Sequence, residues 1–190
     1  KKPVDTLLNP VNKQTMRCYA TGVDTDWYAE TGFTAQKIPH RWTGKDSIET
    51  AVSSTEAVRS ALGSEAEVML DVYMSWDADV TIQMNTALQH VGIHWFEDVL
   101  TPDDLAELGR LREQIHPVNM AGGEHEFTDR GFAEISKNRS YDIWQPDITW
   151  CGGITAGLRI VEMAIQDKAQ VVPHRGGGPW VFNTLAASPT

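Results

Sequence analysis

The sequence predicts an α/β fold of the (β/α)8 barrel type, of which this chain holds about seven βα units. Short β-forming stretches alternate with stretches whose apolar residues recur at helical spacing, which is typical of parallel strands joined by helices. No glycine-rich dinucleotide fingerprint follows the first strand, and this favours a barrel over an open doubly wound sheet. A complete barrel usually needs ~250 residues. Because the chain has 190 residues, we expect the eighth strand to lie beyond Thr190.

The seven strands are predicted from β-type runs in chain order. They cover residues 16–21, 33–38, 68–73, 94–98, 118–122, 142–145 and 170–173. Helices with one apolar face are predicted between them, at residues 48–62, 80–91, 105–115, 131–137 and 158–165. Thr128 or Asp129 is the expected N-cap of the fourth helix, and Thr155 that of the fifth, because their side chains can accept hydrogen bonds from first-turn amides.

Composition restricts the class of function. A hydrophobic content of 41% with seven Trp supports a sizeable core. The net charge of −10 argues against a nucleic-acid partner or an anionic membrane surface, since both need clustered Lys and Arg. Neither a spanning apolar run nor a signal-peptide pattern is present, and two cysteines are too few for a disulfide framework. We therefore expect a cytoplasmic protein with a small-molecule partner.

Titratable residues stand at or just after the C-terminal ends of five successive predicted strands. They are Asp71, Glu97, Glu124, Asp147 and His174, separated by intervals of 23 to 27 residues. In a parallel barrel all strand C-termini meet at one mouth, so the five side chains are expected to converge there. For any one of them a solvated loop position is the simpler interpretation, but that interpretation becomes weak for all five together.

The three carboxylates Asp71, Glu97 and Glu124 predict a cation site. Held close together without a counter-charge, at least one of them would take up a proton. Oxygen ligands that leave positions open for water and substrate favour Mg²⁺ over Ca²⁺. His125 beside Glu124, and His94 near Glu97, leave a transition metal as the alternative.

Asp147 and His174 predict a general base. The carboxylate can accept the hydrogen bond of one imidazole nitrogen, which fixes the tautomer, raises the His pKa and leaves the other nitrogen to take a proton. The glycine-rich stretch that follows Arg175 allows a ligand to approach the backbone, although such stretches also form simple turns.

These residues lie in stretches that resemble the mandelate-racemase subgroup of the enolase superfamily and, within it, the L-rhamnonate dehydratase family. The stretches are LDVYMS at 70–75, WFED at 95–98, GEH at 123–125, QPDITWCGG at 145–153 and VPH at 172–174. The resemblance implies a lyase that removes the C2 proton of a sugar acid through an enediolate and eliminates the 3-hydroxyl, giving a 2-keto-3-deoxy acid. It implies the same Mg²⁺ ligands and the same base pair as the spacing does.

The subgroup often carries Lys-x-Lys at the end of the second barrel strand, whereas here Lys37 is followed two positions on by Pro39. Residues i and i+2 share a strand face, so the second amine is missing and we expect dehydration without racemisation. Lys37 is a candidate ligand of the substrate carboxylate, with a solvated strand-end lysine as the alternative. Further candidate substrate-binding residues are His40, Trp42, His125 and Arg175.

The resemblance also implies an N-terminal capping domain, which this chain does not contain. Residues 1–15 are then expected to be a lead-in segment from that domain, and residues 16–190 a partial barrel lacking its last strand. The family habit implies a homo-oligomer. Other acid-sugar dehydratases, acting on galactonate, gluconate or mannonate, stay open as alternatives, as does a catalytically dead metal-binding barrel.

Overall fold

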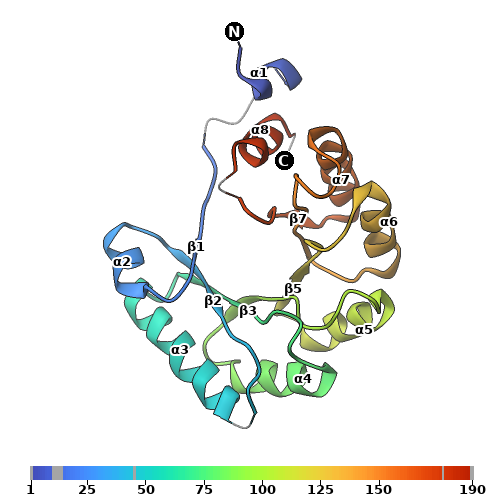
Figure 1. Ribbon diagram of the computed structural model, residues 1–190. Coiled ribbons are helices and arrows are strands. Elements are labelled where there is room, and N and C mark those ends of the chain that lie inside the picture. Colours follow the sequence, from blue (N-terminus) through green and yellow to red (C-terminus); the bar gives the residue numbers. More distant parts are fainter. Residues whose placement is uncertain (1, 10–14, 45, 177, 189–190) are drawn as a thin grey trace. The chain divides into compact units, whose positions relative to one another are not determined.

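The structure is a computed structural model that describes residues 2–9, 15–44, 46–176 and 178–188 (Figure 1). It divides into two compact units. The first unit comprises residues 18–121, and the second comprises residues 1–17 together with 122–190. Of the expected lead-in segment, residues 1 and 10–14 lie outside the described part.

The first unit alternates strands and helices as predicted. Its elements are β1 (Ala20–Thr21), α2 (Thr25–Glu30), β2 (Ala35–Pro39), α3 (Asp46–Leu62), β3 (Glu67–Asp71), α4 (Ala78–Ala87), β4 (Ile93–Glu97), α5 (Leu105–Ile115) and β5 (Asn119–Gly122), whose last residue belongs to the second unit. Each strand from β1 to β5 pairs in parallel with the next one along the chain. Helices α3, α4 and α5 lie along the outer side of these strands (Figure 1).

Strand β3 illustrates how the first unit forms its core. Val68, Met69 and Leu70 are consecutive and all fully buried. A strand covered on both faces reads as a continuous apolar run, because neither face meets water. The run ends on Asp71, the last residue of β3. A polar residue at this point is therefore positioned by a rigid buried strand.

The second unit contains the remaining described elements. They are α1 (Val4–Leu8), α6 (Thr128–Asn138), β6 (Ile143–Trp144), α7 (Ile154–Asp167), β7 (Gln170–Val171) and α8 (Pro179–Ala187). Strand β6 pairs in parallel with β7. Helix α1 packs beside α8, where the Asp5 amide donates to Asn183 Oδ1 at 2.9 Å.

All seven predicted strands are confirmed in existence and order, although the first begins only at Ala20.

The expected N-caps are wrong. Helix α6 begins after Phe127, whose backbone is extended, and α7 begins after Gly153, whose φ of 85° favours glycine over a side-chain cap. Helices α1, α2 and α8 were not predicted. None of the helices in the described part of the chain is long and apolar enough to span a membrane.

Candidate functional site

In the first unit, Lys37 in the middle of β2 meets Asp71 and Glu97, the last residues of β3 and β4. Lys37 Nζ lies 3.2 Å from Asp71 Oδ2 and forms a second ion pair with Glu97 Oε1. The Trp95 indole donates its Nε1–H to the other Glu97 oxygen at 3.0 Å. Lys37, Asp71 and Glu97 are only 5%, 8% and 1% exposed. The structure therefore buries two predicted metal ligands beside a cation of the chain itself.

The electrostatics of this cluster reflect burial and like charge. Burial raises the pKa of Asp71, and the Glu97 carboxylate raises it further, to about 6, against the opposing effect of Lys37. Burial on its own would lower the pKa of Lys37, but the neighbouring Glu97, Tyr19 and Asp71 outweigh it and hold that pKa above its usual value. Two buried carboxylates with oxygen donors only are a donor set that suits a hard divalent cation. Asp71 and Glu97 are therefore suitable as two of the ligands of a magnesium ion.

In the second unit, His174 lies between two carboxylates. Its Nδ1 is 3.0 Å from Asp147 Oδ2, and its Nε2 is 3.5 Å from Glu124 Oε2. The side chain of Asp147 is 2% exposed and that of His174 is 24% exposed. The Val172 amide donates to the Trp144 carbonyl oxygen at 2.9 Å, so the parallel ladder continues beyond β7 toward His174. One imidazole nitrogen thus faces a buried carboxylate, and the other faces Glu124.

Asp147 has a second set of hydrogen bonds. Its Oδ1 accepts from the amide of Thr149 at 2.8 Å and from the Thr149 hydroxyl at 2.6 Å. Burial raises the pKa of Asp147, but these two bonds and the contact with His174 outweigh it and bring the pKa below its usual value. The carboxylate is therefore ionised at neutral pH, as a partner of an imidazole N–H must be.

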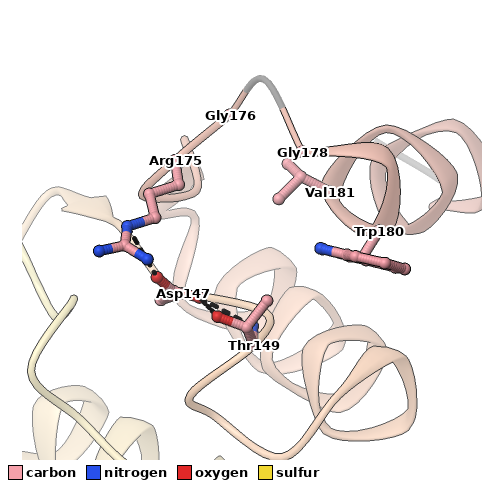
Figure 2. A pocket seen from close by; sticks show the side chains of 7 residues that line it. All are labelled: Asp147, Thr149, Arg175, Gly176, Gly178, Trp180 and Val181. Atoms are coloured by element: carbon pink, nitrogen blue, oxygen red, sulfur yellow. Dashed lines mark hydrogen bonds and ion pairs between the residues drawn. The ribbon is translucent and has the colours of Figure 1, made fainter.

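Asp147 also lines a cavity of about 420 Å³ in the second unit. The lining residues are Asp147, Thr149, Arg175, Gly176, Gly178, Trp180 and Val181. Figure 2 shows the Arg175 guanidinium turned toward Asp147, with Nε 3.9 Å from Oδ2. Beside the cavity, Trp150 lies edge-on to the His174 ring at 6.3 Å and stacks on Phe127. The base pair is thus bordered by a cation and by aromatic rings.

The other candidate substrate-binding residues are distributed over both units. His40 is 7% exposed, its ring packs against Trp76 at 6.4 Å, and burial lowers its pKa. The backbone amide of Trp42 donates to Ser75 Oγ at 2.9 Å. His125 Nε2 lies 3.7 Å from Glu124 Oε1. The roles of these residues stay predictions.

The predicted Mg²⁺ ligands belong to different units, since Asp71 and Glu97 lie in the first and Glu124 in the second. The set of three therefore remains a prediction.

Thr149 was missed as a partner of Asp147, although a hydroxyl residue two positions after an Asp is a familiar turn pattern and was a usable signal. Trp150, beside His174, and Trp180, which lines the cavity, were also not predicted as site residues. No comparable turn pattern indicated where their rings would lie.

Comparison with known proteins gives consistent matches. L-rhamnonate dehydratase of Saccharopolyspora erythraea is 32% identical over 178 residues, which are 92% of this chain and 46% of that protein. The crystal structure of rhamnonate dehydratase from Gibberella zeae complexed with Mg has a TM-score of 0.85 at 28% identity, covering 98% of this chain and 47% of that one. A racemase from Streptomyces coelicolor A3(2) with bound magnesium has a TM-score of 0.88 at 25% identity, covering 98% and 54%. The chain spans about half the length of these relatives.

A family model described as "Enolase C-terminal domain-like" matches residues 24–188, which is most of the chain. This match agrees with the parallel βα repeats of both units and confirms the predicted barrel-type fold. It also confirms the resemblance to the enolase superfamily that the strand-end motifs indicated. The chain therefore belongs to the enolase C-terminal domain-like family.

Proposed function

We propose that the full-length protein is a magnesium-dependent acid-sugar dehydratase that acts on L-rhamnonate or a similar aldonic acid. The observation that carries the proposal is the 3.0 Å contact between His174 Nδ1 and the buried carboxylate of Asp147. A base needs a fixed tautomer and a partner that stabilises its protonated form, and this contact supplies both. The rhamnonate dehydratases among the relatives support the substrate class.

Asp71, Glu97 and Glu124 are the proposed ligands of Mg²⁺. When bound, the ion stabilises the negative charge that develops on the substrate carboxylate during proton removal and so makes the C2 proton more acidic. Two of the relatives contain magnesium. The burial of Asp71 and Glu97 beside one another supports the assignment, because Lys37 supplies only one positive charge to two neighbouring carboxylates and a bound cation would balance the other.

His174 performs the proton transfers in this proposal. It takes the C2 proton on Nε2, because Nδ1 is held by Asp147. The protonated imidazole then returns that proton to the departing 3-hydroxyl, so that water leaves and the C2–C3 double bond forms. The enol product tautomerises to the 2-keto-3-deoxy acid. Asp147 keeps its negative charge throughout and stabilises the imidazolium.

The test is a screen of the full-length protein, with Mg²⁺, against L-rhamnonate, galactonate, gluconate and mannonate, with detection of 2-keto-3-deoxy acids. We expect product from L-rhamnonate or from a closely similar sugar acid. Turnover of one of the other acids alone would identify the alternative dehydratase. The dead-barrel alternative predicts that Mg²⁺ binds while no sugar acid is converted.

Turnover is expected to require Mg²⁺, and Glu97→Gln is expected to weaken Mg²⁺ binding while the protein stays folded. The reason is that the amide cannot supply the negative charge of a carboxylate ligand. Isothermal titration with Mg²⁺ measures the affinity, and circular dichroism checks the fold. Glu134→Gln, on the exposed surface of α6, is the matched control. Full turnover after chelation, with no metal found by elemental analysis, would contradict the proposal.

The enzyme is expected to dehydrate its substrate without interconverting C2 epimers. A racemase needs a base on each face of C2, and Pro39 offers no amine beside Lys37 on β2. The measurement is NMR of the unreacted substrate recovered at partial conversion. Epimer formation as fast as dehydration would show that another group acts as a base on the opposite face.

A further inference from the structure

We propose that Thr149 is a positioning residue of the base pair, which holds the Asp147 carboxylate in the orientation that presents Oδ2 to His174. This inference rests on the proposed function, because it concerns the same proton transfer. The three residues concerned, Asp147, Thr149 and His174, all belong to the second unit. Thr149 lies in the stretch 145–153 that carries the family resemblance, but the sequence predicted no role for it.

The hydrogen bonds of Asp147 are divided between its two oxygens. Oδ1 accepts the amide and hydroxyl of Thr149, at 2.8 and 2.6 Å, while Oδ2 faces His174 Nδ1 at 3.0 Å. The terminal torsion of an Asp side chain has a broad energy minimum, so the carboxylate plane is not fixed by its own rotamer preference. Two donors on one oxygen restrict that rotation. They thereby direct the other oxygen toward the imidazole.

Burial makes this arrangement consequential. The Asp147 side chain is 2% exposed, so water cannot readily replace a lost donor. The Thr149 hydroxyl carries one hydrogen, and donating it to Asp147 leaves the oxygen only as an acceptor toward the cavity that Thr149 also lines (Figure 2). The Thr149 hydroxyl therefore donates its hydrogen bond to Asp147 and has no hydrogen left to donate to the substrate.

The substitution Thr149→Val isolates the hydroxyl, because it keeps the backbone amide and nearly the same shape. Loss of one hydrogen bond to a buried charged group corresponds to a factor of ~10 to 10². We expect kcat to fall by about that factor, with KM changed much less, because Thr149 orients the base and does not hold the substrate. Thr149→Ser retains the hydroxyl and is expected to restore kcat. Thr86→Val, on the exposed surface of α4, is the matched control.

A second readout does not depend on turnover. A low-field proton NMR resonance from the imidazole N–H of His174, identified by its loss in His174→Asn, reports the bond to Asp147. It is expected in the wild type and in Thr149→Ser, and it should shift upfield or broaden in Thr149→Val. An unchanged resonance together with an unchanged kcat in Thr149→Val would overturn the inference. If no sugar acid is converted, the proposed function fails, while the resonance still decides the role of Thr149.

Discussion

Replacing His174 with Asn is expected to lower kcat of the full-length protein by at least the ~10²–10⁴-fold that general-base catalysis contributes. Asn is similar in size to the imidazole but cannot accept a proton at neutral pH. Substrate binding is expected to survive, because His174 is not one of the proposed ligands of the substrate. Steady-state kinetics with detection of the keto acid measures the effect. His90→Asn, at an exposed position, is the control.

The base pair is expected to behave as one unit in a double-mutant cycle. Asp147→Asn should have a milder or comparable effect, since it disturbs the orientation of a base that is still present. The double variant should lose much less than the product of the two single losses. Near-normal turnover of a folded His174→Asn protein would show that His174 is not the base, and the proposed mechanism would then be wrong.

Lys37→Met is expected to have the largest effect on stability. Its ammonium contacts both Asp71 and Glu97 in a buried cluster. Removing one partner of a buried ion pair costs ~3–5 kcal/mol, because the remaining charge is left uncompensated. Denaturant unfolding in the presence of a chelator measures the loss. Adding Mg²⁺ should recover part of it, since a cation bound to the native state replaces the missing charge and stabilises that state by mass action.

Lys137→Met provides the comparison, because Lys137 forms an exposed ion pair with Glu134 whose contribution should be small. Should Lys37→Met unfold at the same denaturant concentration as the wild type, with and without Mg²⁺, the cluster would not depend on a cation. That result would also weaken the case for Asp71 and Glu97 as metal ligands.

The order of the strands and the location of the polar residues could be predicted because both follow from local patterns. A buried parallel strand reads as an apolar run, as in Val68 to Leu70, and its end is marked where a polar residue appears, as at Asp71. The contact between Asp147 and His174 was likewise anticipated, because the two residues follow successive parallel strands.

Contacts that depend on side-chain direction could not be predicted in the same way. Strand periodicity assigns Lys37 to a face but gives no distance, so its pairing with Asp71 and Glu97 was not foreseen. His40 follows a strand as expected, yet its ring is buried against Trp76, because the choice of rotamer depends on packing that the sequence does not display. Helix α8, from Pro179 to Ala187, was missed because its residues showed no clear apolar periodicity.

The central claim, that His174 removes the C2 proton of a sugar acid, is tested most directly with substrate carrying deuterium at C2. The measurement is the rate at which that label appears in the solvent water, compared between the wild type and His174→Asn in the presence of Mg²⁺. The account predicts release by the wild type, and in the variant a release slowed by the same factor as dehydration. Release at the wild-type rate from a folded His174→Asn protein would contradict it.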